Sequence, residues 1–141
     1  MKIAIGSDHG GFALKEKLKV FLRKHAISFH DFGAYGEDAV DYPDFARKVA
    51  KAVAAKKYAR GVLVCGSGVG VAMAANKIKG IRAVQVYDAY SAEMSRRHND
   101  ANVITFAGRR MKPSIARHLL NLWLKTPFEG GRHLRRVKKI G

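Results

Sequence analysis

The segment Cys65-Gly66-Ser67-Gly68-Val69-Gly70 places a thiol beside a glycine-rich loop that could bind an anion. A thiolate can act as a base or a nucleophile, and neighbouring N–H groups and a helix N-terminus stabilise it. Three glycines in five residues allow a tight turn that directs several N–H groups outward, which favours a negatively charged ligand. Two simpler interpretations remain open: a turn that needs glycine for its backbone angles, and a buried cysteine that acts as a small hydrophobe.

The glycine spacing departs from both common nucleotide-binding loops. A phosphate-binding loop of the Walker type needs G-x-x-x-x-G-K-[ST], and no lysine follows Gly70. A dinucleotide fingerprint needs G-x-G-x-x-G, whereas this loop reads G-x-G-x-G and is one residue short. Asp88 follows another apolar run and could serve as the ribose-binding acid of such a fold, so dinucleotide binding stays open as an alternative.

Two further segments combine acids, imidazoles and amides. Asp8 and His9 stand beside two glycines after the first apolar run, where they could transfer a proton or bind an anion. His98 and Asn99 follow a segment with helical spacing. Each of these residues also has a simpler explanation, because Asp8 could cap a helix, His98 could complement a helix dipole and Asn99 could end the helix.

The C-terminal part of the chain is strongly basic. The net charge at pH 7 is +16, and residues 101–141 hold ten Lys or Arg residues against one acid, Glu129. Arg132 and Arg136 are four residues apart, so on a helix both guanidinium groups face the same way and can bind one phosphate. The charge favours an anionic partner, which could be a phosphorylated metabolite, a nucleic acid or a membrane surface; a solvated basic surface is the alternative.

Composition excludes several classes of protein. Hydrophobic residues make up 48% and charged residues 27%, as in folded domains rather than disordered or collagen-like chains. No apolar run approaches the roughly 18 residues of a membrane helix, and the first residues lack a signal-peptide core. The single cysteine forms no intrachain disulfide, so we expect a reducing cytoplasm. No C-x-x-C or H-x-x-x-H spacing predicts a metal site, and the basic tail lacks the aromatic residues of an RNA-binding surface.

The elements that must position these residues alternate between strand and helix. Apolar runs predict five strands, at 1–5, 28–32, 61–65, 82–87 and 102–107. Helical spacing predicts helices at 12–25, from 41, from 70 to about 78, at 91–98, from 113 and from about 132. Parallel strands need crossover helices, so the pattern predicts one domain, residues 1–141, with an α/β fold. We expect a three-layer α/β/α Rossmann-like sandwich with a five-stranded parallel sheet and a C-terminal helix.

Ligands of such sheets bind at the carboxyl ends of the strands. We therefore expect the segments around Asp8, Cys65 and His98 to gather at one edge of the sheet. That edge would hold a base, an acid, two imidazoles, an amide and an anion-binding loop.

Taken together, these motifs resemble the type B ribose-5-phosphate isomerases, in the family of sugar-phosphate isomerases that also includes galactose-6-phosphate isomerase. The matching segments follow the family's order and span nearly the whole chain: 7–12, 41–43, 65–70, 74–77, 80–83, 95–100 and 129–133, with Arg136. The resemblance implies interconversion of ribose 5-phosphate and ribulose 5-phosphate without a metal or an organic cofactor. It also implies a homo-oligomer, dimeric or tetrameric, with active sites shared between subunits. A six-carbon sugar phosphate, allose or galactose 6-phosphate, stays open as the substrate.

The resemblance further implies which residues transfer protons. Cys65 would be the base that moves the proton between C2 and C1, and Ser67 would shuttle a hydroxyl proton. His98 would be the acid that opens the sugar ring, with assistance from Asp8. Some family members use a glutamate shortly after the glycine loop as the base, but residues 71–73 here are Val-Ala-Met, which indicates Cys65.

Other matching residues would bind the substrate without transferring a proton. The loop would stabilise the enediolate oxygens through Gly66, Ser67, Gly68, Val69 and Gly70. Asn99 would orient the sugar hydroxyls. The expected phosphate ligands are His9, Arg109, Arg132 and Arg136.

Overall fold

The computed structural model describes residues 1–141 and contains a sheet of five strands, all of them parallel. The strands are β1 (Lys2–Ser7), β2 (Ser28–Asp31), β3 (Arg60–Cys65), β4 (Ala83–Gln85) and β5 (Val103–Ala107). Their order across the sheet is β2-β1-β3-β5-β4, with β3 in the centre. A helix makes every connection between successive strands, as parallel pairing requires.

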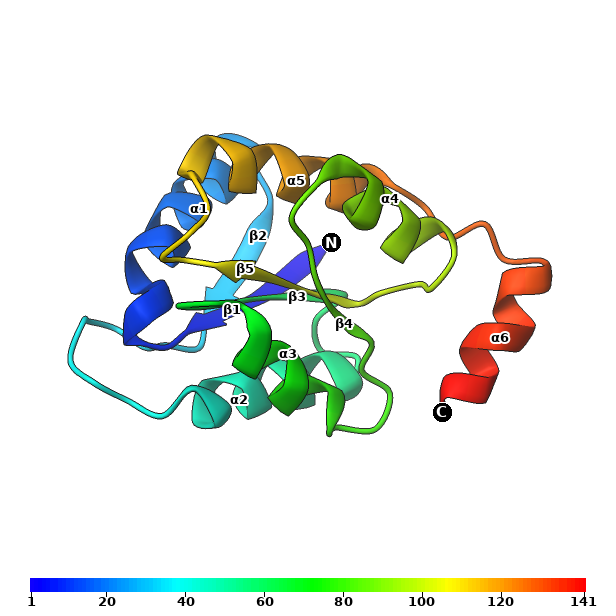
Figure 1. Cartoon of the computed structure of the whole chain (residues 1–141), viewed down its shortest axis with the longest axis horizontal. Helices are drawn as coiled ribbons and strands as arrows, with labels where there is room; N and C mark the ends of the chain where they lie inside the picture. The colour runs from blue at the N-terminus through cyan, green and yellow to red at the C-terminus, as the bar shows by residue number, and fades with distance from the viewer.

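Helices cover both faces of this sheet (Figure 1). The first face carries α1 (Phe12–Lys24), α4 (Ala89–Arg97) and α5 (Pro113–Lys125), which pack around the buried ring of Trp123. The second face carries α2 (Tyr42–Ala54) and α3 (Val69–Asn76), and a short 3-10 turn, η1 (His9–Gly11), precedes α1. The three-layer α/β/α architecture expected from the sequence is therefore confirmed. No helix of the chain has both the length and the apolar character needed to span a bilayer.

The central strand β3 is buried from Gly61 to its last residue because helices lie on both of its faces. Its side chains alternate: Val62 and Val64 belong to the core under α1, α4 and α5, whereas Leu63 and Cys65 belong to the core under α2 and α3. This alternation points the Cys65 thiol toward the face on which α3 begins.

Several element boundaries differ from the sequence prediction. The first strand continues through Gly6 to Ser7, and β4 is confined to Ala83–Gln85. Asp88, rather than Ser91, caps α4, because its carboxylate accepts a hydrogen bond from the Ser91 N–H at 2.8 Å. This capping role gives the Asp88 carboxylate a structural partner and weakens the dinucleotide-binding interpretation.

The last helix, α6 (Arg132–Ile140), projects from the end of the molecule instead of packing on the sheet (Figure 1). Leu134 and Ile140 on this helix are 43% and 62% exposed. Its N-terminus is tied to the body by the Glu129 N–H, which donates to the Arg97 carbonyl at 3.1 Å.

A buried ion pair fixes the loop that follows β2. Lys15 on α1 is fully buried and contacts the Asp31 carboxylate at 2.8 Å, and its ammonium group also donates to the Ala34 carbonyl. Lys19 and the Gly33 N–H donate to the same carboxylate, each at 2.8 Å. Burial alone would raise the pKa of Asp31, but these hydrogen bonds and the lysine charges outweigh it, so the pKa lies below its ordinary value.

Replacing Asp31 by Asn is expected to destabilise the fold by about 3–5 kcal/mol, because it leaves the Lys15 charge buried without a counterion. In the wild type, a lowered folded-state pKa means that this stabilisation is present above the unfolded-state pKa near ~4 and is lost as pH falls through the folded-state value. Urea unfolding at neutral and acidic pH measures both effects. The matched control is Asp44→Asn, whose ion pair with Arg47 is exposed at 3.7 Å, with an expected cost of about 0–1 kcal/mol. Equal losses for the two variants would contradict the assignment.

Candidate active site

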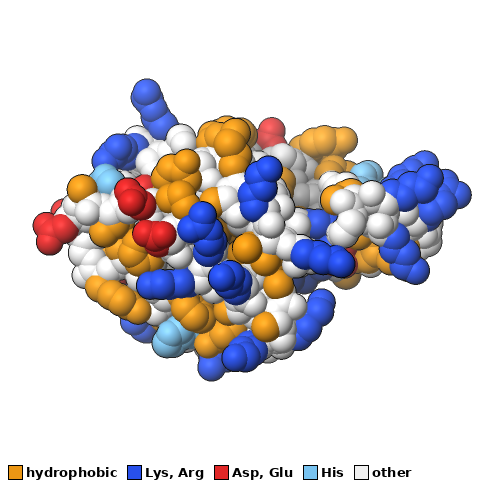
Figure 2. All heavy atoms as spheres, turned by 90° about the horizontal axis from the view of Figure 1, so that it is seen from below, with side chains coloured by type: hydrophobic (Ala, Val, Ile, Leu, Met, Phe, Trp, Pro, Cys, Tyr) orange, Lys and Arg blue, Asp and Glu red, His pale blue; other side chains and the backbone are white.

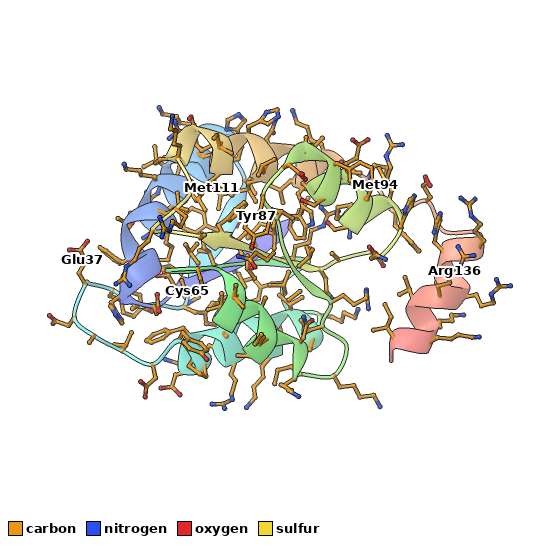
Figure 3. All side chains as sticks on the ribbon, in the orientation of Figure 1. Glu37, Cys65, Tyr87, Met94, Met111 and Arg136 are labelled. Carbon is orange, nitrogen blue, oxygen red and sulfur yellow. The ribbon has the colours of Figure 1, made fainter.

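A cleft of about 640 Å³ opens at the carboxyl ends of β1, β3 and β5. Residues that the sequence predicts for the site form most of its wall. The lining includes Asp8, Cys65, Gly66, Ser67, Val69, Gly70 and Arg109, together with Tyr42. Figure 3 shows Cys65 at this edge of the sheet, beside the start of α3.

The Cys65 thiol is held by the loop that follows it. The Gly68 N–H donates to Cys65 Sγ at 3.2 Å, an interaction that stabilises negative charge on sulfur. Gly68 adopts a left-handed conformation, with φ of 75°, and a Cβ there would lie 2.9 Å from the Phe106 carbonyl carbon, so glycine is required. The free thiol is 4% exposed, at the floor of the cleft.

The loop also offers backbone donors that the chain leaves free. The N–H groups of Gly66 and Ser67 donate no hydrogen bond within the protein. The Val69 N–H, at the first residue of α3, donates to Ser67 Oγ at 3.2 Å. Free donors next to a thiol and a helix N-terminus can stabilise an oxyanion that forms beside the sulfur.

Asp8 lines the cleft at the end of β1, and His9 is the next residue along the chain. The Asp8 carboxylate accepts the Gly11 N–H at 3.0 Å, so Asp8 caps η1, as its simpler explanation predicted, while still lining the cleft. His9 Nδ1 accepts the Val40 N–H at 3.1 Å. This bond assigns the His9 proton to Nε2, which leaves that nitrogen free to donate to a ligand.

Arg109, just after β5, lies across the two glycine turns. A Cβ on Gly10 would lie 3.3 Å from Arg109 Cζ, and one on Gly66 would lie 3.4 Å from Arg109 Cδ, so the arginine side chain packs closely on both turns. Arg109 has no acidic partner within the chain. An unpaired guanidinium group in a cleft is suited to a phosphate.

The remaining predicted residues lie elsewhere, and the expectation of a single edge is wrong for His98 and Asn99, to which it applied. These residues are His98, Asn99, Arg132 and Arg136. α4 starts at the carboxyl end of β4 and runs back across the sheet, so its C-terminus lies at the amino ends of the strands. Arg82, just before β4, donates to the Asn99 carbonyl at 3.0 Å, which places that segment at the amino edge. Figure 3 places Arg136 at the far end of the molecule from Cys65.

The end of α4 and the start of α6 hold the one cluster of metal-ligand type in the chain, formed by His98, Glu129 and His133. The ligand atoms lie within 4.8 Å of one another. The imidazole rings, however, are stacked, with centroids 4.2 Å apart and an angle of 11° between their planes. A metal ion binds in the plane of an imidazole at about 2.0–2.1 Å from nitrogen, so an ion in the plane of one ring is out of reach of the other. The stacked arrangement therefore does not fit a shared metal ion.

Sequence reasoning assigned no role to Tyr42, although the matching segment 41–43 contains it. Tyr42 is the first residue of α2, and its ring lies against the glycine loop: a Cβ on Gly70 would be 2.8 Å from Tyr42 Cζ. The available signal was Pro43, which predicts that a helix begins there. Because α2 follows a loop from the carboxyl end of β2, its N-terminus had to point toward this edge.

The fold and the cleft together define a class: a parallel α/β sandwich that carries a thiol and a loop with free backbone N–H groups at the carboxyl ends of its central strands. The family model that matches residues 3–140 is Ribose/Galactose Isomerase. The chain belongs to this family.

Individual relatives match over nearly their whole length. The chain is 47% identical to "Ribose-5-P isomerase B" of Listeria innocua over 137 residues, which cover 97% of this chain and 93% of that protein. It is 38% identical over 143 residues to "D-erythrulose-4-phosphate isomerase" of Pectobacterium atrosepticum, covering 100% of this chain and 93% of that one. The structure of Clostridium thermocellum ribose-5-phosphate isomerase B superposes with a TM-score of 0.99 at 49% identity, covering 100% of this chain and 95% of that chain.

Proposed function

We propose that this protein is a ribose-5-phosphate isomerase, an aldose–ketose isomerase that interconverts D-ribose 5-phosphate and D-ribulose 5-phosphate. Similarity to relatives named as ribose-5-phosphate isomerase B supports the reaction. The single observation that carries the chemistry is the Cys65 thiol beside the free N–H groups of Gly66 and Ser67. Such a site holds a base next to donors that can stabilise an oxyanion, and a reaction through an enediolate needs both.

The proposed reaction moves one proton from C2 to C1 and one from O2 to O1, and it leaves the overall oxidation level of the substrate unchanged. The Cys65 thiolate takes the proton from C2 of the open-chain aldose, and the resulting enediolate places negative charge on oxygen. The Gly66 and Ser67 N–H groups stabilise that charge, and Ser67 Oγ can pass a proton between the hydroxyl groups. The thiol then returns its proton to C1, which gives the ketose.

We propose that His98 opens the furanose ring and that Asp8 assists at the sugar. Imidazole donates and accepts protons near neutral pH, as ring opening requires. His98 and Cys65 lie at opposite edges of one sheet, so a single chain cannot bring both to one sugar. Two copies can do so if the α4–α6 end of each chain meets the cleft of the other.

A homo-oligomer with shared sites, a dimer in its simplest form, is therefore part of the proposal. The projecting α6 supports it: Ile140 and Gly141 line a groove with Ile78, Ile81 and Val84 that one chain leaves open to solvent. Exposed apolar residues on a helix that leaves its own body are suited to contacts with a second copy. Asn99 lines the same groove and would orient sugar hydroxyls in the assembled site.

The proposed phosphate ligands come from both ends of the chain. The unpaired Arg109 lines the cleft, His9 directly follows the cleft residue Asp8, and Arg132 and Arg136 lie one turn apart on α6. Figure 2 shows Lys and Arg side chains gathered on the projecting end of the molecule, where α6 lies in Figure 1. Opposite charge and paired guanidinium geometry favour a phosphate group there.

Replacing Arg132 by Ala is expected to raise KM for ribose 5-phosphate more than it lowers kcat, because phosphate contacts are made equally in ground and transition states. A charge-assisted contact contributes about 1.5–3 kcal/mol, which corresponds to a roughly 10- to 150-fold loss in kcat/KM. Steady-state kinetics measures the split. Arg135→Ala, on the same helix but outside the proposed site, is the matched control and should stay within about twofold. A loss confined to kcat would mean that Arg132 is not a phosphate ligand.

The direct test of the proposed function is a substrate panel assayed with the wild-type protein. We expect the highest kcat/KM with ribose 5-phosphate and very poor turnover of unphosphorylated ribose. Allose 6-phosphate, galactose 6-phosphate and D-erythrulose 4-phosphate test the six-carbon alternatives and the activity in the name of one relative. Absence of ribose 5-phosphate turnover would refute the proposal, and salt-dependent RNA binding in its place would favour the alternative that the net charge of +16 suggests, a basic nucleic-acid-binding module.

The proposed reaction belongs to pentose phosphate metabolism and needs no cofactor, since the thiol, the imidazole and the backbone donors supply every proton transfer and charge contact. We also propose a cytoplasmic location, because the function requires a free thiol and reducing compartments preserve it.

A further inference from the structure

The imidazole rings of His98, at the end of α4, and His133, at the start of α6, form a stacked pair. His98 is the residue that ends α4, and His133 is the second residue of α6. Their ring centroids are 4.2 Å apart with an interplanar angle of 11°. His133 is buried whereas His98 is half-buried, so one ring forms a wall and the other faces outward.

The turn before α6 sets this geometry. Gly130 and Gly131 have φ of 69° and 56°, in the left-handed region that favours glycine. The Glu129 N–H bonds to the Arg97 carbonyl, and the His133 N–H bonds back to the Gly130 carbonyl at 3.1 Å. The turn therefore ties the end of α4 to the start of α6 and places one imidazole over the other.

Hydrogen bonds from the ring nitrogens of His133 do not fix the position of its ring. Its Nε2 is buried without a hydrogen-bond partner, and the Glu129 Oε2 atom is 3.7 Å away, beyond hydrogen-bond distance. The charged groups that face it are His98 from α4, Glu129 from the turn, and Arg132 and Arg136 from α6. Burial, followed by the positive charges of His98 and Arg132, lowers the pKa of His133, and the opposing charge of Glu129 does not reverse that direction.

We propose that His133 is a positioning residue for His98: its flat ring is a platform that holds the His98 imidazole in the orientation needed to open the sugar ring. This inference rests on the proposed function. The lowered pKa of His133 favours its neutral form, and two stacked imidazolium ions would repel each other. His98 is therefore the member of the pair that accepts and donates the proton. His133 thus acts through its shape and not through proton transfer of its own.

Substitutions that separate the ring from its nitrogens test the proposal. His133→Phe keeps a flat ring and removes the unpartnered nitrogen, so kcat for ribose 5-phosphate should stay within about threefold of wild type. His133→Ala removes the platform and should lower kcat roughly tenfold or more, with KM within about threefold. His133→Leu fills the space without a flat ring and should behave like His133→Ala, so it replaces that variant if the smaller residue impairs folding. His118→Ala, at an exposed histidine of α5, is the control and should leave kcat unchanged.

Two further measurements locate the defect. Exchange of the ribulose 5-phosphate C1 proton with solvent deuterium depends on the Cys65 end of the site. The exchange rate of His133→Ala should therefore stay within about threefold of the wild-type rate. The His98 Cε1 proton should show an upfield ring-current shift in wild type and in His133→Phe, and should lose it in His133→Ala.

The outcomes are distinct. If kcat of His133→Phe is as low as that of His133→Ala, a ring nitrogen of His133 is required, as in a proton relay, and the proposal is overturned. Full activity in His133→Ala, or an equal rise in KM for Phe and Ala, would also overturn it, the latter by making His133 a phosphate ligand. Wild-type protein without ribose 5-phosphate turnover would instead refute the proposed function, while the ring-current shift would still report whether the rings stack.

Discussion

Replacing Cys65 by alanine is expected to abolish isomerisation of ribose 5-phosphate in both directions. The sulfur is the only group in the cleft that combines basicity with a hydrogen bond from the glycine loop, since Gly68 N–H donates to it at 3.2 Å. Removal of the base leaves the free N–H groups and the phosphate ligands in place. Substrate affinity, measured by calorimetry, should therefore change only several-fold.

The size of the kcat loss decides the role of Cys65. Retention of more than about a tenth of wild-type kcat, a barrier change below roughly 1.4 kcal/mol, would make Cys65 structural and the base another group. Cys65→Ser keeps the shape of the side chain but supplies a much weaker base, and it should be equally inactive. Val62→Ala, on the same strand and in the opposite core, controls for loss of packing: it should lower stability while kcat persists.

Mixing Cys65→Ala chains, which lack the proposed base, with Arg132→Ala chains, which have a raised KM, is expected to restore activity at substrate concentrations below KM that neither protein has alone. In a shared site, the thiol of an Arg132→Ala chain meets the arginine of a Cys65→Ala chain, so each mixed dimer holds one intact site. Random exchange in a two-fold symmetric dimer makes half of the dimers mixed, which should return about a quarter of wild-type activity.

The restoration requires that subunits exchange, so the two proteins are unfolded and refolded together before the assay. Each protein refolded alone serves as the control: Cys65→Ala should stay inactive, and Arg132→Ala should keep its low kcat/KM. A wild-type monomer that is fully active in sedimentation experiments would refute the shared site. Failure to restore activity although mixed dimers form would show that Cys65 and Arg132 act within one chain.

Local motifs explain why the Cys65 half of the site could be predicted from the sequence. Cys65, the glycine loop and the start of α3 are contiguous, so a buried apolar run followed by glycines is sufficient to place a thiol at a helix N-terminus. The same holds for Asp8 and His9, which directly follow β1. Helical spacing and parallel pairing rules likewise predict the three-layer fold, because each element is specified by its own residues.

The position of His98 was predicted wrongly because it precedes a strand instead of following one. In a parallel sheet each helix runs back to the amino edge, so a residue between α4 and β5 belongs to the edge opposite Cys65. The stacking of His98 on His133 depends on the turn through Gly130 and Gly131, whose direction no local pattern specifies. Tyr42 reaches the cleft only because α2 and α3 pack side by side. This contact belongs to the tertiary structure, and no local sequence pattern specifies it.

The concentration of positive charge on the projecting helix gives ionic strength two opposite effects. Each chain carries +16, so two approaching copies repel each other, and salt that screens this repulsion should strengthen their association. The same salt weakens the attraction between the arginines and a sugar phosphate. Turnover at low protein concentration should therefore pass through a maximum as salt rises. Assembly of the two copies limits turnover at low salt, and binding of the sugar phosphate limits it at high salt.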